Sequence, residues 1–579
     1  MFRLLLKYTK QFTFAAILAP ILVIVEVILE QSIPRLMTQI VDNGINGVGG
    51  SNLELIYSLG KSMVLLSVLA MVFGAASGIL TAVASSGFIR NLREAMYKRI
   101  QEYSFANMDK FEVPSLVTRM TKDMREFRMA YIAIVRMLVR SPMQLVTATV
   151  MVFRINRSLG KVFFIAIPVL GIGLYLISHY AHPRFRVLMK KFDNMNASLE
   201  ENFMGIRVVK TFVREDFEKE KFDRTSKDVL KQQRFAESLV LLNSPMFNLV
   251  MYACMIAVAW FGGKQIIVGD MTTGEFMSFL SYLRSILFGL MMLSMALMQI
   301  IFAQASVDRA NEILDEVPSI SDTGCDPNLF MEDGSVEIRN VNFKYSEKAH
   351  KNSLSDINLS IKSGETIGII GGTGSGKTSL VQLLPRLYDV SEGEVIVGGH
   401  NVKEYKLENL RKDVAMVLQK NVLFSGTIEE NLKWGNLNAS HEEVEEAAKC
   451  AQAHDFITSF PKGYETDLGQ GGVNVSGGQK QRLCIARALL KKPKIIILDD
   501  STSAVDTDTD KRIRNALKER LAGMTTIIIA QRVSSIMDAD KIVVMKDGCI
   551  DQIGNHEQLM AENEEYHDLY VTQMQGVSE

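Results

Sequence analysis

The chain has 579 residues, which exceeds the size of one ordinary domain and predicts at least two. Its 64 Lys and Arg residues nearly balance its 65 Asp and Glu residues, so the overall charge gives no reason to expect a nucleic-acid partner. Its 5 cysteines lie far apart with no CxxC pair, which disfavours both a disulfide framework and a zinc site.

Apolar residues are concentrated in the first half of the chain. Six runs there reach or approach the ~20 apolar residues that a helix needs to cross a bilayer. The basic, amphipathic segment before the first run predicts an interfacial helix rather than a signal peptide. We therefore expect a transmembrane domain at 1–315, a linker at 316–334 and a soluble domain at 335–579, with spans near 14–40, 58–86, 130–153, 162–181, 243–268 and 274–303.

Lys and Arg gather in the loop between the second and third spans and in the loop between the fourth and fifth. Because cytoplasmic loops carry an excess of positive charge, we expect both loops and both termini in the cytoplasm. The short basic loop at 154–161 runs against this orientation. The two long loops are charged and prone to form helices, so we expect the spans to continue as helices that turn near 105–115 and 208–216, although plain solvated loops are the alternative.

Two features of the spans leave alternatives open. Glu26 and Glu30 are four residues apart and share a helix face, where they could meet a cationic substrate, pair with an arginine such as Arg284, or lie near the interface. Met291, Met295 and Met298 form a stripe beside Gln299. The stripe is typical of helix packing, and it would also suit varied apolar ligands.

The soluble half carries the residues of phosphate chemistry. "ETIGIIGGTGSGKTSLVQLL" predicts a strand, a glycine loop and a helix start, and residues 371–378 match G-x-x-x-x-G-K-[ST]. Such a loop turns backbone N–H groups toward phosphates, while Lys377 balances their charge and Thr378 can ligate Mg²⁺. In "KKPKIIILDD" a buried strand ends at Asp499, which can hold the Mg²⁺ shell, and Asp500 follows on the side where water would attack.

These motifs together resemble the ATP-binding cassette (ABC) exporters along nearly the whole chain. Tyr345 resembles the residue that stacks on adenine, Gln419 the glutamine that contacts Mg²⁺ and the attacking water, "VSGGQ" at 475–479 the signature motif, and "SAVD" at 503–506 the D-loop. Upstream, "SLVTRMTKDM" and "GIRVVKTFVRE" are similar to the exporter loops. The resemblance implies an all-α six-helix transmembrane domain with long intracellular helices, followed by an α/β P-loop nucleotide-binding domain.

The resemblance also implies ATP and Mg²⁺ as cofactors and assigns roles to residues. The implied catalytic residues are Lys377, Gln419, Asp500 and Gln531, and the implied Mg²⁺ ligands are Thr378, Gln419 and Asp499. The implied nucleotide contacts are Tyr345, Gly371, Thr373, Gly374, Ser375, Gly376, Lys377, Thr378, Ser379, Gln419 and Asp499, with Ser476, Gly477, Gly478, Gln479 and Asp506 reaching a partner's nucleotide.

The sequence departs from the family pattern at three positions. Asp500 stands where hydrolysing cassettes have glutamate, Gln531 stands where the switch segment has histidine, and Gln470 replaces another glutamate. A shorter carboxylate and an amide that cannot carry a proton predict a site that binds ATP and hydrolyses it slowly. Because the signature is intact, we expect a heterodimer with a hydrolysis-competent half-transporter; a homodimer with two slow sites is the alternative.

The expected function is ATP-dependent export of amphiphilic small molecules, such as drugs, lipids or peptides, by a multidrug-type exporter. We expect an integral protein of a bacterial cytoplasmic membrane that contacts membrane lipid and has its nucleotide-binding domain in the cytoplasm. A nucleotide-gated channel or regulator, and an importer built on the exporter fold as in some siderophore systems, are the alternatives. The sequence does not identify the substrate.

Overall fold

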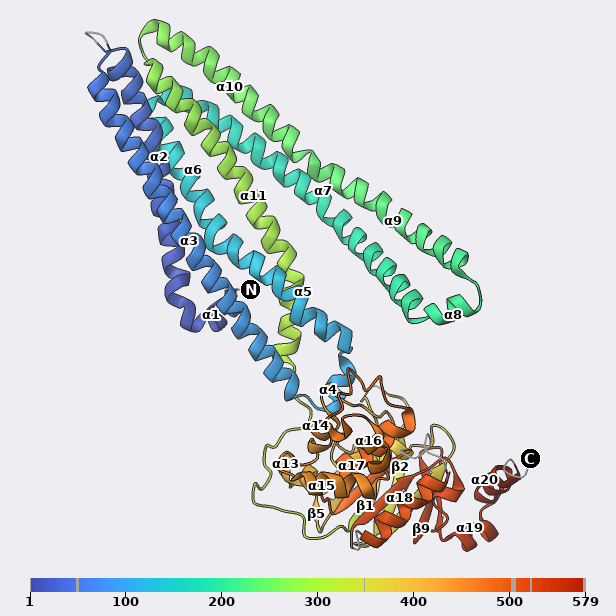
Figure 1. Ribbon diagram of the computed structural model, residues 1–579. Helices are drawn as coiled ribbons and strands as arrows, with labels where there is room; N and C mark the ends of the chain where they lie inside the picture. The colour runs from blue at the N-terminus through green and yellow to red at the C-terminus, as the bar shows by residue number, and fades with distance from the viewer. Residues whose placement is uncertain (1, 48–50, 348, 501–506, 521–522, 576–579) are drawn as a thin grey trace. The chain divides into compact units, whose positions relative to one another are not determined.

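The computed structural model describes residues 2–47, 51–347, 349–500, 507–520 and 523–575. These residues form two compact units (Figure 1). The first unit contains Met1–Gln101 and Glu112–Glu316, and the second contains Glu102–Phe111 and Val317–Glu579.

The first unit is helical. Among the described residues, 6 helical segments are long and apolar enough to cross a membrane, which confirms the expected six-helix domain. One of them, α3, has 49 residues and so extends about 74 Å, more than twice the ~30 Å hydrocarbon core. The helices are α1 (Phe2–Thr9), α2 (Thr13–Gln39), α3 (Leu53–Gln101), α5 (Val113–Ile132), α6 (Leu138–Ile155), α7 (Arg157–Met204), α8 (Ile206–Thr211), α9 (Glu215–Leu241), α10 (Asn243–Val268) and α11 (Thr273–Asp315).

Long helices lie side by side in this unit. Helix α7 runs antiparallel to α9 and α10, and the short helix α8 joins α7 to α9, as Figure 1 shows. Helix α8 lies within the second expected turn, at 208–216, apart from its first two residues. Helices α5 and α6 are joined by a π-helical turn at Ala133–Met137 and form one continuous rod.

The two glutamates of α2 share one arginine of α6. The Arg140 guanidinium pairs with Glu26 and lies 2.7 Å from Glu30 Oε2. The suggestion that Arg284 pairs with these glutamates is therefore wrong. The physical reason is that α6 packs against α2 with Arg140 facing it, whereas Arg284 lies on an exposed face of α11.

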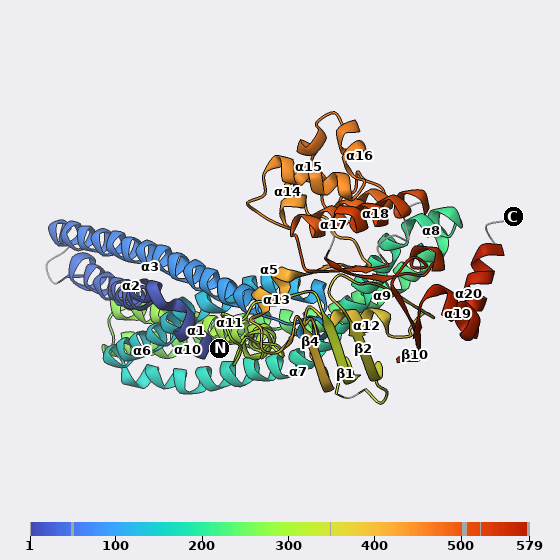
Figure 2. The ribbon, with the colours of Figure 1, turned by 90° about the horizontal axis from the view of Figure 1, so that it is seen from below.

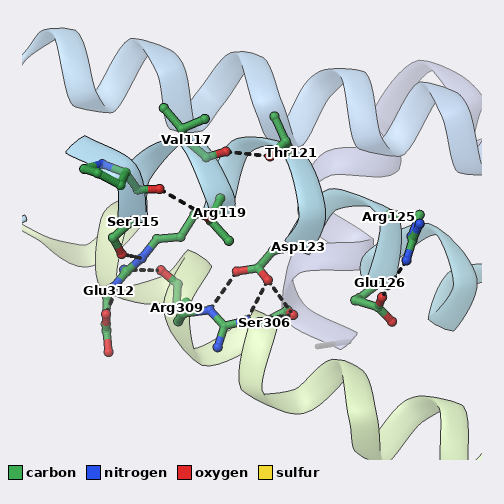
Figure 3. Close-up of polar contacts among 12 residues, drawn as sticks. Ser115, Val117, Arg119, Thr121, Asp123, Arg125, Glu126, Ser306, Arg309 and Glu312 are labelled. Carbon is green, nitrogen blue, oxygen red and sulfur yellow. Dashed lines mark hydrogen bonds and ion pairs between the residues drawn. The ribbon is translucent and has the colours of Figure 1, made fainter. Parts of the chain in front are cut away.

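A polar cluster joins α5 to α11, and we call it the α5–α11 clamp (Figure 3). Arg309 donates two hydrogen bonds to the Asp123 carboxylate, from Nε to Oδ2 at 2.7 Å and from Nη2 to Oδ1 at 2.6 Å. The Ser306 hydroxyl also donates to Oδ1, at 3.1 Å. One turn away, Arg119 Nη1 donates to Glu312 Oε2 at 2.7 Å and to the Arg309 carbonyl at 3.0 Å. Asp123 is buried, so its charge depends on these partners.

The second unit is an α/β domain with two sheets. One has the order β10-β9-β3-β8-β7-β6 and the other β2-β1-β4-β5. The strands are β1 (Val336–Phe343), β2 (Leu354–Ile361), β3 (Thr366–Gly371), β4 (Glu392–Val397), β5 (His400–Asn401), β6 (Val414–Val417), β7 (Ile495–Asp499), β8 (Thr525–Ile529), β9 (Lys541–Lys546) and β10 (Cys549–Gly554).

Strands β6, β7, β8, β3 and β9 are parallel, so their carboxyl ends meet at one edge of the sheet. Loops at that edge are the usual place for a ligand site in such sheets. The helices are α12 (Lys377–Gln382), α13 (Leu407–Asp413), α14 (Ile428–Lys433), α15 (His441–Cys450), α16 (His454–Ser459), α17 (Gly477–Leu490), α18 (Thr507–Arg520), α19 (His556–Glu562) and α20 (Glu564–Gln575), and Figure 2 shows α14–α17 gathered away from β1, β2 and β4.

The short helix α4 (Phe105–Lys110) lies in the first expected turn and packs within the second unit. The Asn107 amide donates to the Val317 carbonyl at 3.0 Å, and Asn107 Oδ1 accepts from the Ser319 N–H at 2.9 Å. The Tyr388 hydroxyl donates to Asp109 Oδ2 at 2.6 Å. Helix α4 is thus held by the linker and by the α/β domain.

We predict that Asp123→Ala destabilises the first unit by about 2 kcal/mol, because Arg309 and Ser306 lose charge-assisted hydrogen bonds. Thermal unfolding of the purified full-length chain measures this loss. The matched control is Glu312→Ala in the same clamp, which should cost under about 1 kcal/mol because the Glu312 side chain is 57% exposed. Equal losses in the two variants would contradict the assignment of Asp123 as the buried centre of the clamp.

Candidate nucleotide-binding site

The loop between β3 and α12 has the shape of a phosphate cradle. Gly374 and Gly376 have φ of +84° and +96°, in the left-handed region that favours glycine. A Cβ at Gly374 would meet no atom within 4 Å, so the loop is open on that side. A Cβ at Gly371 would lie 2.1 Å from the Met545 carbonyl oxygen, so only glycine fits beneath the loop. An anion can approach the loop from its open side at Gly374.

Lys377 lies folded over this loop. Its Nζ donates to the carbonyls of Gly371 and Gly372 at 2.9 and 2.8 Å. Burial lowers the pKa of Lys377, while the charges of Asp499 and Asp500 act in the opposite direction. An ammonium group held by two neutral carbonyls and by the Ser375 hydroxyl, at 3.3 Å, is available to a polyphosphate, which would offer it a stronger partner.

Thr378 and Asp499 place two oxygen ligands side by side. The Thr378 hydroxyl donates to Asp499 Oδ1 at 3.0 Å, and Asp499 is 2% exposed. Burial raises the pKa of Asp499, and the neighbouring Asp500 adds to this effect. A divalent cation would relieve the cost of burying this charge. The hydroxyl and carboxylate oxygens are ligands of the kind that Mg²⁺ prefers.

A cavity of about 510 Å³ adjoins the glycine loop and is bordered by Tyr345, Gly374, Gly376 and Lys377 among others. This volume lies within the range of small-molecule sites. The Tyr345 hydroxyl shares a hydrogen bond of 2.8 Å with Ser379, next to Thr378 at the start of α12. The structure thus brings the expected base-stacking residue to the same cavity as the phosphate loop.

Asp500 contacts one backbone carbonyl and the side-chain amides of three glutamines. Its N–H donates to the Ile529 carbonyl at 3.0 Å, and the Gln481 side chain donates to its carbonyl at 3.3 Å. The Gln531 amide donates to Asp500 Oδ2 at 2.6 Å, and the Gln419 amide lies 3.4 Å from the same oxygen. Burial raises the pKa of Asp500, and the two amides partly offset that rise. The three expected residues around the attacking water therefore form one hydrogen-bonded group.

Two residues of this group escaped the sequence analysis. Gln573 on α20 donates to the Gln531 carbonyl at 2.8 Å and accepts from the Val533 N–H at 2.8 Å, so it fixes the backbone of the switch segment. Gln481 fixes the backbone of Asp500 in the same way. Neither residue belongs to a motif that we singled out. A contact between segments that are distant in sequence leaves no local signal.

The signature residues begin α17. Ser476 caps the helix, accepting from the Gln479 N–H at 3.3 Å, and the Gln479 side chain accepts from the Ser476 N–H at 2.8 Å. Ser476 and Gly477 are exposed and thus accessible to another molecule. Gln470 is also exposed, in a loop that precedes α17. Asp506, expected in the D-loop, lies outside the described residues.

Comparison with known proteins agrees with this geometry. A family model described as the ABC transporter transmembrane region matches residues 16–291, and one described as ABC transporter matches 354–503. The uncharacterized ABC transporter ATP-binding protein YfiB of Bacillus subtilis is 33% identical over 98% of both chains. An ATP-dependent lipid A-core flippase of Syntrophus aciditrophicus is 33% identical over 86% of this chain and 82% of its own.

Among solved structures, a bacterial Atm1-family ABC exporter with ATP bound covers 97% of this chain and 98% of its own, with a TM-score of 0.82. At 24% identity this likeness shows the fold alone. The chain therefore belongs to the ABC transporter family, in which it is an exporter half-transporter with a transmembrane domain followed by a nucleotide-binding domain.

Proposed function

We propose that this exporter subunit works beside a second, different half-transporter, and that its own ATP site binds nucleotide but hydrolyses it slowly. The observation that carries the proposal is the hydrogen bond of 2.6 Å between Gln531 and Asp500. In this pair an aspartate and an amide occupy the places of the glutamate and histidine of hydrolysing cassettes. Both groups that would handle the attacking water and the γ-phosphate are therefore altered.

The change from glutamate to aspartate acts through distance. An aspartate carboxylate lies closer to its backbone by one C–C bond, and a misplacement of ~1 Å can cost about 100-fold in rate. The Asp500 backbone is bonded to Ile529 and Gln481, so it has little freedom to move forward and compensate. The carboxylate would therefore fall short of a water aligned with the γ-phosphate.

The change from histidine to glutamine acts through charge. An amide donates a hydrogen bond, but it neither accepts a proton nor carries positive charge at neutral pH. The Gln531 amide also binds the Asp500 carboxylate directly, and a hydrogen bond to the charged form lowers the proton affinity of a base. Gln531 thus weakens Asp500 as a proton acceptor in addition to lacking the properties of histidine.

The groups that bind nucleotide are retained. Lys377 and the loop at 371–378 would hold the phosphates, and Tyr345 would contact the base. Thr378, Asp499 and Gln419 would hold Mg²⁺, which neutralises phosphate charge when it is bound. A site of this composition binds ATP tightly, and slow hydrolysis then keeps the nucleotide in place.

The intact signature supports a partner of a different kind. Ser476 and Gly477 are exposed at the start of α17 and would complete the site on the partner's Walker motifs. The partner is expected to bring the glutamate and histidine that this chain lacks. The flippases among the relatives act on lipid A-core, which favours a membrane-embedded amphiphile as the class of substrate. We place the nucleotide-binding domain in the cytoplasm of a bacterium, on the basis of the basic loops.

The test is single-turnover hydrolysis by the assembled pair, and a half-transporter gene adjacent to the gene of this chain would be the first candidate for the partner. We expect this chain's site to occlude ATP and to hydrolyse it at least about 100-fold more slowly than the partner's site. Replacing the partner's Walker B glutamate with glutamine should abolish steady-state turnover. Equal hydrolysis at the two sites would refute the asymmetry, and so would a purified homodimer of this chain that turns over at about 1 s⁻¹ or faster.

We predict that Asp500→Glu alone recovers little hydrolysis, because Gln531 still binds the carboxylate and still lacks a charge. The double variant Asp500→Glu with Gln531→His should recover more than the sum of the single changes. ATPase assays on the pair with the partner's glutamate replaced by glutamine measure this chain's site alone. Gln470→Glu is the matched control, since it reverses the third departure without touching Asp500 and should leave the rate unchanged. Full recovery from Asp500→Glu alone would contradict the role of Gln531.

A further inference from the structure

One face of α11 is left uncovered by the other helices of this chain. We call it the outward stripe and define it by six exposed residues that fall on one side of the helix: Met277, Ser281, Arg284, Phe288, Met295 and Phe302. Phe288 and Met295 are 45% and 58% exposed. The methionine at 295 belongs to the stripe that the sequence left open between packing and ligand binding. The other two methionines of that stripe, Met291 and Met298, are half-buried.

Hydrogen bonds from another face of α11 to α2 and α6 determine which way the outward stripe points. The Ser285 hydroxyl accepts from the amides of Gln31 and Gln144 at 2.7 and 2.8 Å, and the Tyr282 hydroxyl donates to the Gln31 carbonyl at 2.8 Å. These bonds join α11 to α2 and α6. Helix α11 cannot turn about its axis to bury Arg284 without breaking them.

The expected span at 274–303 places Arg284 within the hydrocarbon core of the membrane. Arg284 follows Thr273, the first residue of α11 at the outer end of the span, by eleven positions. At 1.5 Å per residue this distance is about 17 Å, roughly half of the ~30 Å hydrocarbon core. A guanidinium at this depth is costly in lipid, so it faces a water-filled cavity or an anionic group.

The chain itself supplies no carboxylate for Arg284. The acidic residues of the expected spans are Glu26, Glu30 and Glu275. The first two share Arg140, and Glu275 closes the capping box at the outer end of α11 with Thr272. Among the described residues, no ion pair or hydrogen bond is found for the Arg284 side chain. The positive charge of the outward stripe is therefore unbalanced within this chain.

We propose that the outward stripe binds an anionic amphiphile. Arg284 takes the phosphate or carboxylate headgroup in a two-nitrogen contact, and Phe288, Met295 and Phe302 contact the apolar chain. This inference rests on the proposed export function and names its substrate class. It differs from the suggestion of a cationic substrate drawn from Glu26 and Glu30, two carboxylates that share the single guanidinium of Arg140.

The test measures binding without nucleotide, on the full-length chain in phosphatidylcholine nanodiscs. The probe is radiolabelled dodecyl phosphate, with dodecanoate, dodecylphosphocholine and dodecyltrimethylammonium as unlabelled competitors of equal chain length. We expect the two anions to displace the probe and the other two amphiphiles to compete poorly. The more effective of the two anions identifies the headgroup as phosphate or carboxylate. Equal displacement by the cationic amphiphile would overturn the proposal.

Substitutions in the outward stripe test whether the probe binds there. Arg284→Gln should weaken binding by about tenfold or more, and Arg284→Lys by less because it keeps the charge but loses the two-nitrogen contact. Met295→Ala should weaken dodecyl phosphate more than octyl phosphate, since Met295 lies eleven positions, or about 17 Å, beyond Arg284 and only the longer chain extends that far. Lys264→Gln at the outer end of α10 is the matched control for loss of one positive charge and should change nothing.

Unchanged dodecyl phosphate affinity in Arg284→Gln would overturn the proposal. If the same variant also dissociates from the partner subunit, Arg284 instead pairs with an acidic side chain of that subunit. Because no ATP is present, fast hydrolysis at this chain's own site would refute the asymmetric transporter and leave this binding result intact.

Discussion

The nucleotide site depends on the parallel register of three buried strands. Ile529 at the end of β8 pairs with Asp499 of β7 on one side and with Ile369 of β3 on the other. This register brings the glycine loop after β3, Asp500 after β7 and Gln531 after β8 to one edge of the sheet. The strands β7 and β8 are buried throughout, so the edge is fixed by the core and not by the residues that react. Substitutions at 500 and 531 can therefore change chemistry without changing the fold.

Helix α17 connects this edge to the surface that a partner would contact. The helix begins with the signature glycines, of which Gly477 is exposed, and Gln481, about one turn further along, donates to the Asp500 carbonyl. The Ser476 capping box fixes the first turn through two reciprocal hydrogen bonds. The same short helix thus supports both the weakened site of this chain and the intact motif offered to another. A chain can keep the signature motif while its own site weakens, because the two roles use different residues of α17 and its N-cap. Ser476 and Gly477 are offered to the partner, whereas Gln481 contacts Asp500.

Local motifs made much of the architecture predictable. The glycine loop, the strand before Asp499 and the apolar spans are each contained in one stretch of sequence, and the helix and strand periods identify them. The pairing of Glu26 with Arg140 was not predictable, because it depends on the register between α2 and α6. The same holds for Gln573, whose bonds to the switch segment join α20 to the end of β8. Asp500 and Gln531 were each suspected from the sequence. Their direct hydrogen bond required the sheet.

The membrane domain shows why counting charges along a span does not give the polarity of a binding surface. By sequence, two glutamates on one face of α2 suggest a negative site. In the structure Glu26 is buried against α6 with Arg140, and its other neighbour is the backbone of α3, where a Cβ at Gly74 would lie 2.8 Å from its carboxylate oxygen. The Glu26 carboxylate is therefore buried and paired with Arg140, whereas Arg284 lies on the uncovered side of α11. The charges that remain accessible are those that the helix packing does not bury, and here Arg284 is exposed while Glu26 is buried.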